Sequence, residues 1–523
     1  MARRIAILLM LVGLIGGIGV VPVATAQEAP PGAIKNFEFL GNISGLNNIT
    51  SINVLNYGDR DVLVAVGRFG VRTFDLSDPA TPTDLDHLPS ADLMVPGDTG
   101  GTFWQSESTN VDQKRKLIFL SRDPRAYGGN QSNPDHLSGV YIIDARDPEA
   151  LELLTFHSIP AGHTSTCING CQFLWTGGPA VRDDMPSDWA GRPVFVTDIR
   201  DPLNPYTYPD PVDTGRNDGI TDYAHDVQVD NSGVAWVSGR GSVRGYWTSG
   251  RHWDPVEERF RVARAWDPIP YAGGGGPGAW KATGPAVVHN SERPIDGMPG
   301  ERKGIGNRDS ERPERPWASD GSDYEAYGFE PGDLLYATHE DFNGSCAQRG
   351  RFYIVSLRGS HDGEAWRSTP EDPFSLEVLS SWHPWGEEGQ TTGVNSCSGH
   401  YFRMKDGMVY MSWYQQGTRV LDISDPYNPI QVAYFRPNGG VNSYTPMLYK
   451  DLVYVADSSR GIDILRLTDD AFGVAATGQE VVAPALSDEE LALSLAGFEP
   501  DPVMGWSCRV PVTGQLPAQA RPI

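Results

Sequence analysis

Long amphipathic helical patterns are scarce in this sequence, and so are long apolar runs. After residue 26 no segment approaches the ~20 apolar residues that a bilayer span requires, so we expect no membrane span in the mature chain. Turn-forming residues are abundant instead, with 59 Gly and 41 Pro, and aromatic residues make up 10% of the chain. This composition favours an all-β protein with many turns.

Positive charge is also in short supply. The chain has 42 Lys and Arg against 67 Asp and Glu, which gives a formal net charge of −25. A surface this acidic repels phosphate backbones, so nucleic acid is excluded as a partner. We expect a soluble monomer. Its ligand is an unknown small molecule, protein or polymer, which the net charge does not identify.

Several familiar catalytic motifs are missing. The sequence contains neither a G-x-S-x-G nucleophile elbow nor an H-E-x-x-H zinc signature, which argues against serine hydrolases and zincins. The glycine-rich stretch 271–278 follows no strand–helix phosphate motif, so we assign no cofactor-binding residues from motifs. Catalytic residues also remain unassigned from motifs alone.

The first 26 residues have the pattern of a secretory signal peptide. Two arginines precede an apolar run that ends in Ala-Thr-Ala, which predicts cleavage after Ala26. The alternative is an uncleaved membrane anchor, because the apolar run is long for a signal. We therefore expect a secreted or cell-envelope protein.

The chain has five cysteines, and export would place them in an oxidising compartment. Four cysteines allow three connectivities, which the sequence leaves open; of these we favour Cys167 with Cys171 and Cys346 with Cys397, and Cys508 has no obvious partner. Thiol-redox chemistry is the alternative for Cys167 and Cys171, but their spacing is C-x-x-x-C rather than C-x-x-C, and no βαβ pattern surrounds them.

A repeat unit is clearest between residues 397 and 435. Four short runs of alternating apolar residues are separated by Gly, Asp, Asn and Pro, as in an antiparallel meander. Similar units begin near Ile49, Ser106, Gly162, Ala224 and Val287, and a last one begins near Ser443. The fifth unit is interrupted by a polar insertion at about 296–330, and the fourth is expected to end with a strand near 258–266.

The last unit has only three evident strands, while residues 36–44 form one orphan strand before the first unit. If the N-terminal strand completes the last sheet, the ring closes and no edge strand stays exposed. We therefore predict an all-β, seven-bladed β-propeller of four-stranded antiparallel sheets over residues 36–467. Residues 468–523 are expected to form a tail with one short helix at 486–498.

Four strand–turn segments share a hydrophobic strand, an Asp and an Asp-Pro turn: GVRTFDLSDPATP, GVYIIDARDP, PVFVTDIRDPLNP and GTRVLDISDPYNP. On these residues the chain resembles the LVIVD-repeat family of exported bacterial propellers. The resemblance implies the fold and no particular activity. The turn aspartates Asp78, Asp147, Asp201 and Asp425 are expected to accept backbone hydrogen bonds rather than to catalyse.

Four histidines occupy one place in the repeat. His163, His225, His289 and His400 each stand at the start of a first strand, in units three to six. The first strand of each blade lines the central channel of a propeller, so these side chains are expected to converge on the axis. The insertion obscures the register of His289, and His339 is its alternative.

Four convergent imidazoles predict a transition-metal site. Iron or copper is favoured, because four nitrogen ligands leave an open position only on an ion that takes five or six ligands. Zinc is less favoured for that reason. Calcium is less favoured because the acidic loops at 230–233 and 320–325 lack EF-hand spacing. Asp226 and Glu340 are candidate second-shell acceptors that would fix the imidazole tautomers.

The expected geometry is similar to that of carotenoid-cleaving oxygenases, which hold iron with four histidines on a propeller axis, and of the selenium-binding and methanethiol oxidase family, which uses copper. This similarity is an analogy at the level of the fold. The sequence thus predicts a metal-dependent oxidoreductase or oxygenase. The alternative is a non-catalytic extracellular propeller that contacts proteins or polymers, with the histidines bonded only to carbonyl groups between blades.

Overall fold

The computed structural model describes residues 32–471 with interruptions. The longer ones are 99–106, 179–192, 274–286, 294–333, 341–349, 358–375 and 392–397, and the others are one to three residues long. The predicted signal peptide, the insertion at 296–330, the C-terminal helix and Trp104 lie outside the described residues. So do Cys346, Cys397 and Cys508.

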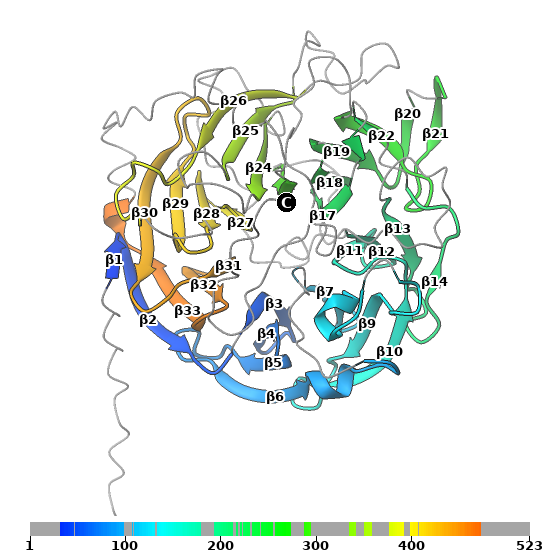
Figure 1. Cartoon of the computed structure of the whole chain (residues 1–523), viewed down its shortest axis with the longest axis horizontal. Helices are drawn as coiled ribbons and strands as arrows, with labels where there is room; N and C mark the ends of the chain where they lie inside the picture. The colour runs from blue at the N-terminus through cyan, green and yellow to red at the C-terminus, as the bar shows by residue number, and fades with distance from the viewer. Residues whose placement is uncertain are drawn as a thin grey trace, which may run out of the picture.

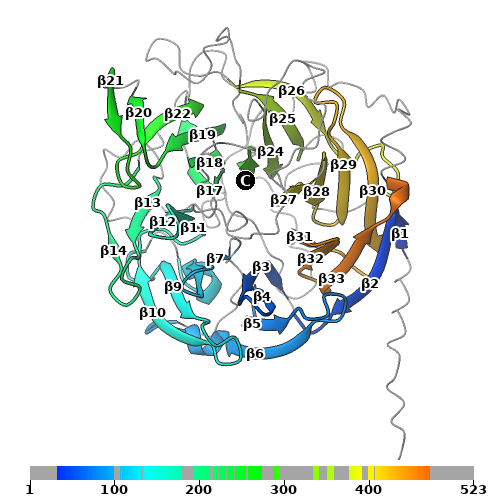
Figure 2. The ribbon, with the colours of Figure 1, turned by 180° about the vertical axis from the view of Figure 1, so that it is seen from behind.

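The fold is a seven-bladed β-propeller, as the repeats predicted (Figure 1). Antiparallel sheets stand in a circle, and the same order is seen from behind (Figure 2). Blades one to three contain, in order, β3 (Ile49–Asn56), β4 (Asp61–Gly67), β5 (Gly70–Asp75) and β6 (Thr83–Pro89); β7 (Asn110–Asp112), β8 (Leu117–Arg122), β9 (Gly139–Asp144) and β10 (Glu152–Ser158); and β11 (Thr164–Ile168), β12 (Phe173–Gly177), β13 (Phe195–Asp198) and β14 (Tyr206–Thr207).

The remaining blades continue the circle. Blades four to seven contain β17 (Tyr223–Val229), β18 (Val234–Arg240), β19 (Ser242–Trp247) and β22 (Ile269–Gly273); β23 (Val287–Glu292), β24 (Leu334–Glu340), β25 (Phe352–Ser356) and β26 (Glu377–Trp382); β27 (Phe402–Lys405), β28 (Met408–Ser412), β29 (Thr418–Asp422) and β30 (Ile430–Pro437); and β31 (Ser443–Tyr449), β32 (Leu452–Asp457), β33 (Gly461–Leu467) and β2 (Phe37–Ile43). Two short 3-10 helices, η1 (Ser90–Leu93) and η2 (Pro124–Tyr127), are inserted beside blades one and two.

The N-terminal segment closes the circle. Strand β2 pairs antiparallel with β33 of blade seven, from Phe37 opposite Leu467 to Ile43 opposite Ile462, and Figure 1 shows the two side by side. Strand β1 (Gly32–Lys35) pairs with β30 and adds a fifth strand to blade six. The predicted closure is confirmed, and the same segment also joins two neighbouring blades.

The predicted last strand of blade four is wrong. Residues Arg259–Val262 form β21, which pairs with β20 (Arg251–Asp254) in a separate hairpin, and β22 completes the blade. In β21 the apolar Phe260 is 56% exposed, whereas Ile269 and Tyr271 of β22 are buried. Alternation of apolar and polar residues is the same in an exposed hairpin and in an outer strand, so the pattern could not separate them.

Apolar faces are buried between adjacent blades. Trp175, Trp236 and Trp413 are fully buried, as expected, and the indole nitrogen of Trp175 donates to the Ala265 carbonyl oxygen at 2.9 Å. Trp382 of blade five meets Trp413 of blade six edge to face at 5.3 Å. Aromatic contacts of this kind fix the spacing between blades.

The turn chemistry agrees with the sequence. The carboxylates of Asp78, Asp147, Asp201 and Asp425 each accept a hydrogen bond from the backbone amide two residues later, at 2.9 to 3.1 Å. Cys167 and Cys171 form the expected disulfide, which closes the turn after β11. Within the described residues no helix is long and apolar enough to cross a membrane.

Candidate metal centre

Hydrogen bonds between neighbouring blades define which inner-strand positions are equivalent. In blades one, two and three the donors Asn53, Asn110 and Thr166 bond to a carbonyl oxygen of the next blade at 2.7, 2.9 and 2.7 Å. The residue three positions before each donor is Thr50, Glu107 or His163. Glu107 is therefore the blade-two counterpart of the histidines.

The same position continues around the circle. His225 Nδ1 pairs with the carbonyl oxygen of His289 at 3.1 Å, and His400 Nδ1 makes the same contact with Tyr444 at 2.6 Å. These hydrogen bonds between neighbouring blades form a belt around the axis. Thr445 Oγ1 closes the belt by donating to the Thr50 carbonyl oxygen at 3.1 Å. Each blade thus contributes one buried side chain to an axial ring, which consists of Thr50, Glu107, His163, His225, His289, His400 and Tyr444.

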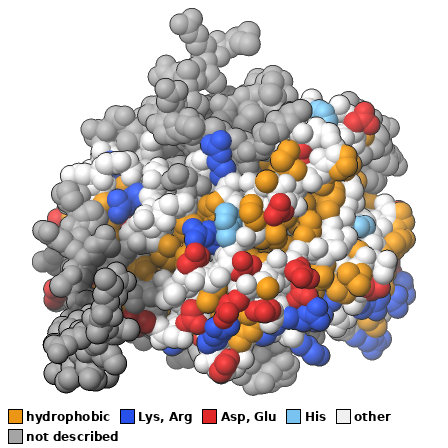
Figure 3. Space-filling model, turned by 90° about the horizontal axis from the view of Figure 1, so that it is seen from below, with side chains coloured by type: hydrophobic (Ala, Val, Ile, Leu, Met, Phe, Trp, Pro, Cys, Tyr) orange, Lys and Arg blue, Asp and Glu red, His pale blue; other side chains and the backbone are white. Residues whose placement is uncertain are grey.

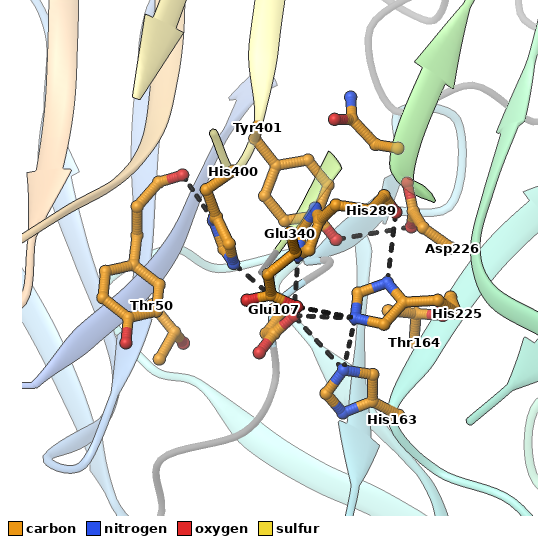
Figure 4. A network of polar contacts seen from close by, with 12 residues as sticks. Thr50, Glu107, His163, Thr164, His225, Asp226, His289, Glu340, His400 and Tyr401 are labelled. Carbon is orange, nitrogen blue, oxygen red and sulfur yellow. Dashed lines mark hydrogen bonds and ion pairs between the residues drawn. The ribbon is translucent and has the colours of Figure 1, made fainter. Parts of the chain in front are cut away.

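The four predicted histidines come together as the repeat register required (Figure 4). Their Nε2 atoms lie near a single atom, Glu107 Oε2, at 3.3 Å for His163, 3.8 Å for His225, 3.4 Å for His289 and 3.7 Å for His400. The Nε2 atoms of His163 and His225 are 3.1 Å apart. All five side chains have zero exposure to solvent.

The backbone fixes how two of the imidazoles present their nitrogens. A carbonyl oxygen can only accept a hydrogen bond, so Nδ1 of His225 and of His400 must carry the proton. Each Nε2 then points a lone pair at the axis. The acceptors that set these tautomers are thus backbone carbonyl groups, and not the carboxylates of Asp226 and Glu340 suggested by the sequence.

Burial favours the neutral form of two of the site histidines, His225 and His289. It lowers the pKa of His289 to about 3, with a further contribution from His400, and holds the pKa of His225 well below its usual range together with His289 and His163. Burial alone would raise the pKa of the Glu107 carboxyl, but the charge of His163 and hydrogen bonding from three histidines hold that pKa well below its usual range. At neutral pH the ring therefore combines a carboxylate with imidazole lone pairs.

Two residues outside the ring complete the surroundings. Glu340, at the end of β24, places Oε2 3.9 Å from His225 Nε2, and its Oε1 accepts a hydrogen bond from the Tyr414 hydroxyl. Asp226 accepts hydrogen bonds from Gln228 Nε2 at 2.6 Å and from the Tyr401 hydroxyl at 3.4 Å. Both carboxylates are buried.

The alternative placement of His339 is wrong. Strand β23 carries a register shift between Val288 and Asn290, and this bulge directs His289 to the axis. His339 packs against Tyr353 with ring centroids 4.7 Å apart, within blade five. The long insertion hid the bulge in the sequence.

The distances suit coordination of one ion. Two ligands that each lie about 2.1 Å from an ion are separated by about 3 Å at a right angle and about 4.2 Å when opposite. The Nε2 atoms of His163 and His225 are 3.1 Å apart, and the Nε2 atoms lie 3.3 to 3.9 Å from the carboxylate oxygens of Glu107 and Glu340. These separations fall in this range. Three sets of donors have all their ligand atoms within 4.8 Å of one another, namely Glu107, His289 and His400; Glu107, His163 and His225; and His225, His289 and Glu340.

Comparison with known proteins identifies no family for this chain. No family model matches the chain, so its resemblance to the LVIVD-repeat family stays a prediction, and no curated protein matches it. Among solved structures, the chain is similar to the β-propeller domain of Cps50 (Swd1) from Myceliophteria thermophila, with 11% identity, a TM-score of 0.44, and coverage of 83% of this chain and 100% of that one. It is also similar to the periplasmic gluconolactonase of Pseudomonas aeruginosa, with 12% identity, a TM-score of 0.43, and coverage of 76% and 88%.

Proposed function

We propose that the protein is a metal-dependent oxidoreductase that holds one iron or copper ion on the propeller axis. The ligands are His163, His225, His289 and His400, with Glu107 as a fifth donor. The observation that carries this proposal is that four buried imidazole nitrogens, from four consecutive blades, lie 3.3 to 3.8 Å from one buried carboxylate oxygen of the neighbouring blade, Oε2 of Glu107. In the non-catalytic alternative the histidines only bond to carbonyl groups between blades. Such bonds explain the orientation of the Nδ1 atoms, but they do not require the Nε2 atoms to approach one another.

The donor geometry favours one ion over two. A carboxylate that bridges two ions presents a different oxygen to each of them. Here the nearest approach of every histidine is to the same oxygen, Oε2 of Glu107. We therefore expect one equivalent of metal per chain.

The type of donor favours a redox ion over structural zinc. Structural zinc sites hold four ligands in a closed tetrahedron, whereas imidazole donors in larger number suit iron and copper. Such an ion supplies one-electron chemistry and activation of dioxygen. The chain contributes a buried cage, in which carbonyl bonds to Nδ1 hold the imidazoles of His225 and His400 in place.

An exported location fits the same proposal. The Cys167–Cys171 disulfide requires an oxidising environment to persist, as in the cell envelope or outside the cell. Exported proteins also meet dioxygen directly. The N-terminal signal pattern points to the same compartment.

Metal analysis of untagged protein tests the proposal. We expect close to one equivalent of iron or copper in the wild type and loss of most of it in the double variant His225→Ala, His400→Ala. The matched control is His87→Ala, because His87 lies on β6 at the outer edge of blade one and is exposed. Circular dichroism shows whether the double variant folds. Unchanged metal content in a folded double variant would reject the site. The non-catalytic scaffold would then be the better-supported interpretation.

A further inference from the structure

Glu340 reaches the axial ring from outside it. The residue ends β24, the second strand of blade five, so it does not occupy the repeat position that supplies the other donors. Its Oε2 is nevertheless 3.9 Å from His225 Nε2, almost the same distance as Glu107 Oε2 at 3.8 Å. Glu340 also forms one of the close donor sets, with His225 and His289. The repeat therefore does not explain why a carboxylate stands here.

A carboxyl group at Glu340 matters because the site is buried. Two carboxylates that face one imidazole nitrogen in a buried region repel each other, and burying charge is costly unless it is compensated. A divalent ion between Glu107 and Glu340 would balance both charges, with neutral imidazoles completing its shell. Figure 4 shows the two carboxylates on the same side of His225.

Tyr414 holds Glu340 in this place. Its hydroxyl donates to Glu340 Oε1, which leaves Oε2 directed at His225. The Tyr414 backbone has φ = 31°, a left-handed conformation that is strained for a residue with a side chain. Its carbonyl oxygen accepts bonds from the amides of Gly417 and Ser443, both at 3.0 Å, so the strained turn is anchored on both sides. Strain that is held this firmly indicates that the position of the hydroxyl is important.

We propose that Glu340 is a further ligand of the ion and that Tyr414 is its positioning residue. This inference rests on the proposed metal site and deepens it. A second anionic ligand stabilises the more oxidised, more highly charged state of the ion. The Glu340–Tyr414 pair therefore sets the redox preference of the site, a role that histidine ligands cannot fill because an imidazole that binds a metal through its lone pair adds no negative charge.

Copper binding to metal-free protein tests the pair, with competing chelators to measure the affinities for Cu(II) and Cu(I) separately. Glu340→Gln should weaken Cu(II) binding by tenfold or more and change Cu(I) binding much less, which is a shift to higher reduction potential. Glu340→Asp keeps the charge and should stay closer to the wild type. Tyr414→Phe should shift the affinities in the same direction as Glu340→Gln, but by less.

The double variant distinguishes positioning from a general packing effect. Because Tyr414 acts through Glu340, Tyr414→Phe should add nothing in the Glu340→Gln background. Tyr401→Phe is the matched control, since both tyrosine rings lie 4.9 Å from the His400 ring while the Tyr401 hydroxyl bonds to Asp226. It should leave the ratio of Cu(II) to Cu(I) affinity unchanged.

The possible failures are separable. If the wild type binds no copper and the metal analysis also finds no iron, the proposed metal site itself is wrong. If the wild type binds one copper ion and folded Glu340→Gln has the same ratio of affinities, Glu340 is not a ligand and the metal site stands without it. An equal effect of Tyr414→Phe in both backgrounds would remove the positioning role.

Discussion

Single residues in this protein either stabilise the fold or form the axial site, and the contacts of each side chain show which role it has. The turn aspartates recur in several blades and accept amide hydrogen bonds at 2.9 to 3.1 Å. The ring position recurs in all seven blades, but histidine occupies it only in blades three to six. The turn aspartates belong to the architecture because each bonds within its own turn, whereas the ring histidines indicate a site because they approach one another on the axis.

Asp457 gives a prediction at this scale that is independent of the metal. It is fully buried at the end of β32, and burial, reinforced by the charge of Asp463, raises its pKa from 3.8 to about 7. The folded protein then binds the proton more tightly than the unfolded chain does. The stabilisation is complete below pH ~4 and is lost as the pH rises to about 7, with a slope of at most ~1.4 kcal/mol per pH unit.

Denaturant unfolding of the wild type and of Asp457→Asn at pH 4 to 9 measures this effect. The free energy of unfolding of the wild type should fall relative to that of the variant between pH 4 and 7, and the difference should be constant above pH ~7. The variant loses one acceptor for the amides of Asn442 and Ser459, so the comparison uses the slope and not the absolute value. Parallel curves would show that Asp457 is ionised in the folded protein throughout.

At the scale of elements, β2 and β1 make contributions that can be told apart. Strand β2 supplies the outer strand of blade seven and buries Phe37 and Phe39, the latter stacked on Phe435 at 5.7 Å. Strand β1 only adds an edge to a blade that already has four strands. Removal of β2 reopens the circle and leaves the edge of β33 exposed.

Two truncations test this difference. A chain that starts at Asn36 lacks β1 and should lose at most a few degrees of melting temperature. A chain that starts at Ser44 lacks both strands and should unfold at much lower temperature or aggregate. Phe39→Ala in the full chain should cost about 3–5 kcal/mol, which confirms that packing by β2 is responsible. Equal melting temperatures for the two truncations would contradict closure by β2.

The sequence predicted the elements well wherever a local pattern determined them. Alternating strands and Asp-Pro turns indicated the seven blades, the closing strand and the place of four histidines. Strand β21 was misassigned because an exposed hairpin has the same alternation as an outer strand. The sequence prediction missed Glu107 because the repeats were matched by their histidines and not by the equivalent position in each first strand. Aligned on the donor residues of the belt, Glu107 is three residues before Asn110, as His163 is before Thr166.

Glu340 was a candidate from the sequence as an acceptor for the imidazoles, but its contact with Tyr414 could not be predicted from the repeats. The two residues come from the end of a second strand and from a strained turn, in blades five and six, and they meet only when the two blades pack. Their contact depends on the distance between blades, which is fixed by buried aromatic residues such as Trp382 and Trp413. Sequence patterns describe a blade, whereas this part of the site belongs to the assembled ring.

On the scale of the whole molecule, the surface and the axis differ in character. Figure 3 shows acidic, basic and apolar side chains on one side of the ring. The axis instead collects donors from blades two to six, so one ion would join five separate sheets. Blades in a propeller contact only their neighbours, and a shared ligand therefore couples parts that are otherwise independent.

Metal binding should consequently stabilise the entire propeller and not one blade. An ion that binds only the folded ring adds about 2.7 kcal/mol to the free energy of unfolding at 100 times its Kd and about 4.1 kcal/mol at 1,000 times. For a domain of this size that corresponds to a rise of a few degrees in melting temperature. Scanning calorimetry with copper should show one transition that moves upward as a unit, and a chelator should reverse it.

The double variant His225→Ala, His400→Ala should not respond, while His87→Ala should respond like the wild type. A shift confined to a minor, separate transition, or the same shift in the double variant, would mean that copper binds elsewhere, because only a ligand on the axis can stabilise five blades together.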